Sequence, residues 1–123
     1  MQIVFAADHG GYELKEQIKK WLSEKKGYKI SDAGALEYKG LDGFTDYSQE
    51  AIERVLRGAV GIFVCGTGLL ASMAANRNKG IRAALCHRVE YAVLAREHTD
   101  ANVLCLGARF LTFDHAIKFL PLP

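Results

Sequence analysis

Short apolar runs alternate along the chain with longer segments of mixed polarity. An apolar run of roughly four to eight residues, bounded by glycine or polar residues, is typical of a buried strand. The predicted strands are Gln2–Ala6, Tyr28–Ala33, Val60–Val64, Arg82–Cys86 and Val103–Leu106. Because helical segments separate these runs, the pattern predicts a regular alternation of strand and helix.

The segment after the first strand shows the helical spacing. Leu14, Ile18 and Leu22 fall on one face of a helix that we expect over about 12–26, with Gly27 ending it. A glycine-punctuated loop is predicted over 34–45. The other predicted helices are one capped by Asp46 and ended by Gly58, then Leu69–Asn76, Val89–Glu97, and a last helix opened by Thr112 or Asp114.

Five alternating pairs of strand and helix indicate an α/β fold. We expect a three-layer αβα sandwich, Rossmann-like, with a five-stranded parallel sheet in the order 2-1-3-4-5. This order places the topological switch point between the first and third strands. Ligands bind there in doubly wound folds, outside the carboxyl ends of the strands.

The most distinctive stretch is Cys65-Gly66-Thr67-Gly68-Leu69-Leu70, which joins the third predicted strand to a run of good helix formers. Its two glycines allow a sharp turn and present bare backbone N–H groups. A helix that starts here directs its free N–H groups toward one point, where an anion would be held and a thiolate at Cys65 favoured. The turn therefore suits chemistry on a small anionic substrate.

Asp8 and His9 follow the first predicted strand, as Cys65 follows the third. In the predicted fold these strands end at the same edge of the sheet, on either side of the switch point. The two polar clusters should therefore flank one crevice. Asp8 has an alternative role as a cap of the first helix, and both roles stay open.

His98 is placed by the pattern between the fourth helix and the fifth strand, at the edge opposite the crevice. Either it has no role, or it serves a second subunit, because a two-fold dimer could carry it to the partner's carboxyl edge. Cys86 and Cys105 lie within strand patterns, and we expect them to pack in the core.

Composition narrows the classes of function. A chain of 123 residues fits one domain, and a net charge of +2 is too small to indicate nucleic-acid or membrane binding. The three cysteines lie in or beside apolar runs, which favours reduced thiols in a cytoplasm. No apolar run is long enough to span a bilayer, and the basic start of a signal peptide is missing.

The glycine turn also fits the loose dinucleotide pattern G-x-G-x-x-A over 66–71. That pattern belongs after the first strand and needs an acid at the end of the following strand, which here reads Leu85-Cys86-His87. The histidines are too sparse for a metal site. We therefore expect neither a nicotinamide cofactor nor a metal.

Six stretches occur in a specific order along nearly the whole chain. They are Asp8-His9-Gly10-Gly11, Cys65-Gly66-Thr67-Gly68, Asn76–Leu85, Arg96-Glu97-His98, Asp100-Ala101-Asn102 and Gly107-Ala108-Arg109. Together they resemble the ribose-5-phosphate isomerase B family. The galactose-6-phosphate isomerase subunits, which are related, match less well at the cysteine and the histidine.

The resemblance implies an aldose–ketose isomerase that needs no metal or cofactor and works through an enediolate. By the family pattern, Cys65 takes the proton from the carbon beside the carbonyl and returns it to the neighbouring carbon. Thr67 assists proton movement between the two sugar oxygens. His98 of the partner subunit opens the furanose ring as an acid, with help from Asp8.

The resemblance also implies a set of substrate-binding residues. His9 and Arg109 would bind the sugar phosphate, with Arg109 at the phosphate. The backbone amides of the turn would hold the enediolate oxygens. The binding set implied in this way is Asp8, His9, Gly66, Gly68, Leu69, Leu70, Thr99 and Arg109.

The chain departs from the family pattern at several positions. Leu70 stands where the family has glycine, Thr99 where it has asparagine, and Thr45 where it has proline. The family continues past the last helix into a basic tail whose arginines bind phosphate, whereas this sequence stops at Pro123. We expect a single isomerase domain over residues 1–123 that lacks this tail and therefore binds phosphate weakly.

These observations lead to one expected function and two alternatives. The first is interconversion of ribose 5-phosphate and ribulose 5-phosphate, in the pentose phosphate pathway of the cytoplasm. The alternatives are a catalytically impaired member that only binds sugar phosphates, and an isomerase for a hexose 6-phosphate. The expected assembly is a homodimer with shared active sites, and pairing of dimers into tetramers stays open. We expect no nucleic-acid or membrane partner.

Overall fold

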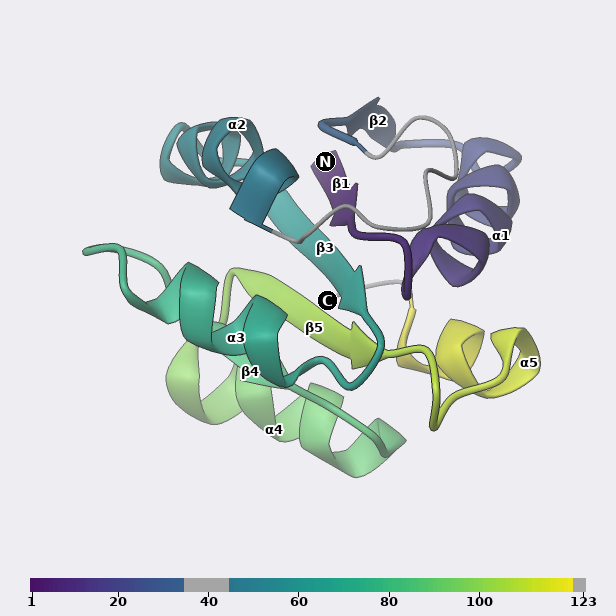
Figure 1. Cartoon of the computed structure of the whole chain (residues 1–123). Helices are drawn as coiled ribbons and strands as arrows, with labels where there is room; N and C mark the ends of the chain where they lie inside the picture. The colour runs from purple at the N-terminus through teal and green to yellow at the C-terminus, as the bar shows by residue number, and fades with distance from the viewer. Residues whose placement is uncertain (35–44, 121–123) are drawn as a thin grey trace.

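The computed structural model describes residues 1–34 and 45–120, with only the backbone for residues 45–47. The strands are β1 (Gln2–Ala7), β2 (Lys29–Asp32), β3 (Val60–Cys65), β4 (Ala83–Leu85) and β5 (Val103–Gly107). The helices are α1 (Tyr12–Ser23), α2 (Thr45–Leu56), α3 (Leu69–Asn76), α4 (Val89–Thr99) and α5 (Phe113–Ala116), followed by a short 3₁₀ turn, η1 (Ile117–Phe119) (Figure 1). The alternation of strand and helix is as predicted. Residues 35–44 of the predicted loop lie outside the described residues, and the predicted cap at Asp46 is wrong, because α2 already begins at Thr45.

The five described strands form one parallel sheet in the order β2-β1-β3-β5-β4. The predicted order 2-1-3-4-5 is therefore wrong in its last two places. β5 is buried along its whole length and pairs on both sides, whereas the three residues of β4 are only half-buried and form an edge. The Asn76 side chain closes this edge, because its amide exchanges hydrogen bonds of 2.8 and 2.9 Å with the backbone of Ala83.

Right-handed crossovers between parallel strands decide which face each helix covers. The chain moves toward β2 through α1 and back from β4 through α4, so these helices lie on one face with α5. α2 and α3 lie on the other face (Figure 1). Side chains alternate accordingly: Phe5, Ile62 and Leu104 belong to the core under α1 and α4, and Val4 and Phe63 to the core under α2 and α3.

Two helix boundaries differ from the prediction. α1 ends at Ser23, earlier than the expected residue 26, and Gly27 follows with a φ of +94°. α4 extends to Thr99 instead of stopping at Glu97, and Asp100 ends it in the left-handed conformation. His98 therefore lies in the last turn of a helix. Among the described residues, no helix is both long and apolar enough to cross a membrane.

Candidate active site

The crevice lies at the carboxyl edge of the sheet, where β1 and β3 are neighbours and their connections diverge. Two glycines hold the loop after β1 against the turn after β3. A Cβ on Gly11 would stand 2.2 Å from the carbonyl oxygen of Val64, and one on Gly10 would stand 3.1 Å from the amide nitrogen of Gly66. Only glycine allows this approach, so the predicted meeting of the two polar clusters is confirmed.

Asp8 is almost buried, with 9% of its surface exposed. Its Oδ1 accepts hydrogen bonds from the backbone N–H groups of Gly10 at 3.0 Å and Gly11 at 3.2 Å. Asp8 therefore fixes the loop that leads into α1, but the alternative role as the helix cap is wrong, because Gly11 is the N-cap residue and no side chain in the described part of the chain caps the helix. The same contacts fix its carboxylate at the crevice, so this role does not exclude a function in binding.

Cys65 is the last residue of β3, and only 3% of it is exposed. Its Sγ accepts a hydrogen bond of 3.1 Å from the backbone N–H of Gly68. Gly68 has a φ of +79° and directly precedes α3, so this donor belongs to a helix N-terminus. An N–H group aimed at the sulfur from a helix N-terminus stabilises negative charge on it, which a proton-abstracting thiolate requires.

Thr67 accepts a hydrogen bond at Oγ1 from the backbone N–H of Leu69, at 3.1 Å. Two of the amides predicted to cradle an anion, those of Gly68 and Leu69, therefore already have acceptors within the turn. Leu69 and Leu70 open α3 and are each about half exposed, at 50% and 48%. The predicted cradle thus has less free donor capacity than the sequence suggested.

The end of β5 supports the cysteine turn from its other side. The backbone N–H of Ala108 donates to the carbonyl of Cys65, and that of Arg109 donates to the carbonyl of Gly66, both at 2.9 Å. A Cβ on Gly107 would stand 2.4 Å from the carbonyl oxygen of Thr67. This support exists because β5, not β4, lies next to β3.

Arg109 is exposed and lies over the turn, since a Cβ on Gly66 would stand 3.1 Å from its Nε. A guanidinium in this position can receive the charged end of an anionic substrate. His9 is also exposed and lines a hollow of about 400 Å³ between α1 and the segment after β5, together with Glu13 and Thr112. The structure therefore brings Asp8, His9 and Arg109 to the edge of the sheet that carries Cys65.

His98 and Thr99 are not brought to this edge within one chain. Both line a separate hollow of about 590 Å³ at the amino end of β4, together with Leu94. Thr99 donates its hydroxyl hydrogen to the carbonyl of Ala95, within its own helix. The predicted placement of His98 at the amino edge is confirmed.

Cys86 and Cys105 are buried in the core, as predicted. Burial raises the pKa of the Cys86 thiol to about 11, and burial also raises the pKa of Cys105. Both thiols are therefore protonated near neutral pH.

Sequence reasoning missed a buried ionic cluster that anchors the crevice. Lys15 of α1 has no exposed surface, and its Nζ lies 2.8 Å from Oδ2 of Asp32, to which Lys19 also donates at 2.7 Å. The other oxygen of Asp32 accepts from the Gly34 N–H at 2.9 Å, and the Gly34 carbonyl accepts from Ala7 at 2.7 Å. The cluster thereby fixes the end of β1 just before Asp8. The sequence holds no distinct signal for it, because Lys15 and Glu16 both lie between Leu14 and Ile18 and only Lys15 is fully buried.

Comparison with known proteins agrees with this arrangement. A family model described as Ribose/Galactose Isomerase matches residues 3–121. The "Probable ribose-5-phosphate isomerase B" of Mycoplasma pneumoniae is 42% identical over 120 residues, which are 96% of this chain and 78% of that protein. Ribose-5-phosphate isomerase B of Clostridium thermocellum has a solved structure that superposes with a TM-score of 0.90 at 41% identity, covering 97% of this chain and 80% of that one.

A second similar structure contains a bound sugar phosphate. Ribose-5-phosphate isomerase B of Mycoplasma genitalium, with bound ribulose-5-phosphate, gives a TM-score of 0.90 at 38% identity over 96% of this chain and 79% of that chain. The match to the family model covers nearly the whole chain, and the resemblance inferred from the six sequence stretches is confirmed. The chain therefore belongs to the ribose/galactose isomerase family and is an isomerase.

Proposed function

We propose that the chain interconverts ribose 5-phosphate and ribulose 5-phosphate through an enediolate, in a homodimer whose two active sites are each built from both subunits. The hydrogen bond from the Gly68 N–H to Sγ of Cys65 is the observation that carries the chemical part of this proposal. The Mycoplasma genitalium relative, whose structure holds ribulose-5-phosphate, supports the choice of substrate. The pathway and the cytoplasmic location predicted from the sequence belong to the same proposal.

The reaction moves one proton between neighbouring carbons. The Cys65 thiolate takes the proton from C2 of the open-chain aldose, and the electron pair of that C–H bond forms the enediolate double bond. The resulting thiol then returns the proton to C1, which gives the ketose. The Thr67 hydroxyl, fixed by its hydrogen bond with the Leu69 amide, carries the proton between the oxygens on C1 and C2.

The charged end of the substrate is placed by Arg109 and His9. Both are exposed at the edge that carries Cys65, and the Arg109 guanidinium lies against Gly66. A planar guanidinium can bind two phosphate oxygens at once, which fixes orientation as well as charge. Asp8, held by two backbone amides, would contact a hydroxyl of the sugar during ring opening.

The proposed dimer joins the molecules along the β4 edge. Six exposed apolar side chains flank this edge on the two helices beside it: Leu69, Leu70 and Met73 on α3, and Tyr91, Val93 and Leu94 on α4. Exposed apolar side chains gathered in this way indicate an interaction surface. A two-fold axis perpendicular to the strands, placed beside β4, reverses the strand direction in the second subunit. The amino ends of the strands in one subunit then lie next to the carboxyl ends of the strands in the other. His98 of the partner subunit then reaches the Cys65 crevice as the ring-opening acid.

A coupled assay with ribose 5-phosphate tests the proposal. The wild type should form ribulose 5-phosphate, and Cys65→Ala should reduce kcat by more than about a hundredfold while leaving the fold intact. Cys86→Ala is the matched control, since it removes a buried thiol outside the crevice and should keep most of the activity. A Cys65→Ala enzyme that retains more than about a tenth of the rate would exclude Cys65 as the general base.

The same assay separates the alternatives raised by the sequence. Turnover of a hexose 6-phosphate in preference to ribose 5-phosphate would reassign the substrate while keeping the mechanism. Binding of both sugars without turnover of either would identify a family member that only binds sugar phosphates. Either result would overturn the proposed function.

A further inference from the structure

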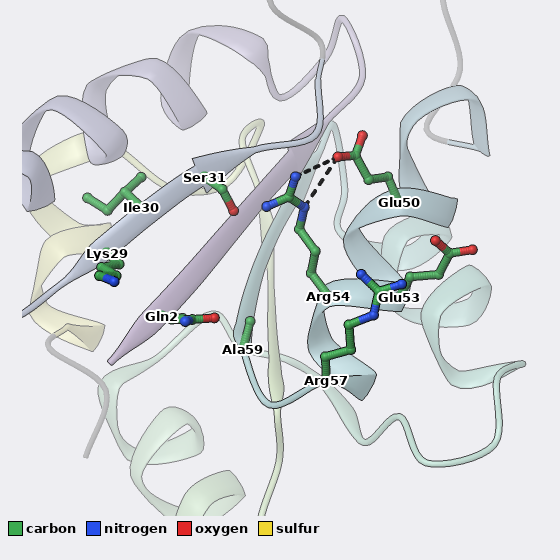
Figure 2. Close-up of a pocket in the computed structure, with 9 residues that line it drawn as sticks. All are labelled: Gln2, Lys29, Ile30, Ser31, Glu50, Glu53, Arg54, Arg57 and Ala59. Atoms are coloured by element: carbon green, nitrogen blue, oxygen red, sulfur yellow. Dashed lines mark hydrogen bonds and ion pairs between the residues drawn. The ribbon is translucent and has the colours of Figure 1, made fainter.

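A hollow of similar size to the one beside His98 lies at the amino ends of the strands, on the face that α2 covers. α2 packs over β1 and β3 through Ala51, Ile52 and Val55, and among the described residues no helix covers β2 on that side. Lys29 and Ser31 point to this face, because Ile30 between them packs into the opposite core. The flank of α2 and the uncovered part of β2 thus form the walls of a hollow of about 550 Å³ (Figure 2).

The hollow is well separated from the Cys65 crevice. Gln2 and Lys29 begin β1 and β2, and Ala59 directly precedes β3, so the lining comes from the amino ends of the strands. The six residues of β3, at about 3.3 Å per residue, place the two edges of the sheet roughly 16 Å apart. A ligand in the hollow would therefore not touch Cys65.

The charged side chains around the hollow differ in whether they have ion-pair or hydrogen-bond partners within the chain. Glu50 accepts two hydrogen bonds from Arg54, at 3.2 Å from Nε and 2.8 Å from Nη2, and Glu53 accepts one from Gln49 at 3.3 Å. Within the part of the chain that the structure describes, Lys29 and Arg57 form no ion pair and no side-chain hydrogen bond (Figure 2). Glu50 is thus neutralised by Arg54, while Glu53 is bonded only to the neutral Gln49 amide and keeps its charge. Lys29 and Arg57, two cations on separate elements, are left for an external anion against this one carboxylate.

The chemistry of the lining indicates what kind of molecule would fit. A guanidinium binds phosphate oxygens in pairs, and a lysine supplies a second, compact charge. Figure 2 shows Lys29 on β2 and Arg57 at the end of α2, on opposite sides of the hollow, an arrangement that suits a ligand with two anionic groups. Ser31 and the Gln2 amide supply neutral partners for hydroxyl groups, and the volume lies within the ordinary range of small-molecule sites, about 300–1,000 Å³.

We infer that this hollow is a second binding site, for a small metabolite that carries two phosphates and sugar hydroxyls. Lys29 and Arg57 bind the phosphates, and Gln2 and Ser31 contact the hydroxyl groups. The site is independent of the isomerase reaction, since it shares no residue with the crevice and lies at the other edge of the sheet.

Titration calorimetry on the full chain tests this inference with ADP and fructose 1,6-bisphosphate, which hold their phosphates adjacent and apart, respectively. At least one of them should bind with one site per chain, more tightly than AMP and also in the presence of saturating ribose 5-phosphate. Arg57→Gln and Lys29→Gln should each weaken this binding by about tenfold, and Arg57→Lys by less, without changing the isomerase rate. Lys118→Gln, which removes an exposed cation far from the hollow, is the matched control and should leave affinity unchanged.

Several results would overturn the inference. Absence of binding of both bisphosphates at millimolar concentration would identify Lys29 and Arg57 as solvated surface cations. Displacement by ribose 5-phosphate would assign the binding to the crevice. An equal loss in Lys118→Gln would show that net charge, not the hollow, attracts the ligand. Because binding is measured directly, the test is decided whether or not the isomerase proposal holds.

Discussion

Two inactive variants, Cys65→Ala and His98→Ala, should restore activity when they are unfolded, mixed and refolded together. The reason lies in the distance between the two side chains within one chain. Cys65 ends β3 at the carboxyl edge, and His98 lines the hollow at the amino end of β4. The sheet separates these edges by roughly 16 Å, whereas an acid and a base that act on one pentose must both come within about 3 Å of it.

The amount of restored activity follows from pairing statistics. Equal mixing gives about one half mixed dimers. In a mixed dimer, one site combines both substitutions and is inactive, while the other combines intact Cys65 from one chain with intact His98 from its partner. About a quarter of the wild-type rate should therefore return, and neither variant alone should recover any. The assay is the coupled conversion of ribose 5-phosphate after refolding.

A matched pair of variants makes the result specific. Cys65 and Thr67 belong to the same turn of the same chain, so mixing Cys65→Ala with Thr67→Ala leaves a substitution in both sites of every dimer. This mixture should stay inactive. If the wild type regains activity after the same treatment while the Cys65 and His98 variants together do not, the shared-site geometry is refuted, and His98 acts within its own chain or not at all.

Two further substitutions test the supports of the crevice. Gly107→Ala places a Cβ 2.4 Å from the Thr67 carbonyl oxygen, so it should displace the cysteine turn. We expect the free energy of unfolding to fall by about 1–3 kcal/mol and kcat to decrease, as measured by thermal melting and the coupled assay. Unchanged stability would show that the turn can move aside without cost. Asp32→Asn should lower the free energy of unfolding by about 3 kcal/mol at neutral pH, because it removes the carboxylate that lies 2.8 Å from the buried Lys15 ammonium, which keeps an ion pair with Glu16 at 3.2 Å. Burial alone would raise the pKa of Asp32, but hydrogen bonds from Lys15, Lys19 and the Gly34 amide outweigh it and lower the pKa below 3.8. The stabilisation is therefore present above pH 3.8 and is lost as the pH falls below it. Denaturant titrations should accordingly give free energies of unfolding for the variant and the wild type that converge in acid. A difference that persists in acid would contradict the ion-pair explanation.

The sequence predicted the parts of this protein that depend on local pattern. The strand–turn–helix at Cys65 and the meeting of the segments that follow β1 and β3 depend on apolar runs and glycines, and both are present. The order of β4 and β5 could not be predicted in the same way, because strand order depends on which strands bury both faces. The signal was weak but present: the runs Ala83–Cys86 and Val103–Leu106 have the same length, and the second has the larger apolar side chains.

The residues that hold the site in place were harder to predict from the sequence. Lys15 is charged and would ordinarily be assigned to a solvated helix face, and its burial becomes evident only once Asp32 is known to face it. The close approaches of Gly11 and Gly107 to neighbouring backbone likewise depend on which loops meet in three dimensions. The placement of His98 at the amino edge could be predicted, since it needs only the order of elements along the chain.

The central position of β5 has a consequence for folding during synthesis on the ribosome. β3 and β4 are synthesised before β5, yet β5 separates them in the finished sheet. Until Val103–Gly107 leaves the ribosome, both neighbouring strands expose backbone edges that could pair with the wrong chain. The carbonyls of Cys65 and Gly66 also lack their donors, Ala108 and Arg109, at this stage. Insertion of one late strand therefore protects the nascent sheet and completes the reactive turn in the same step.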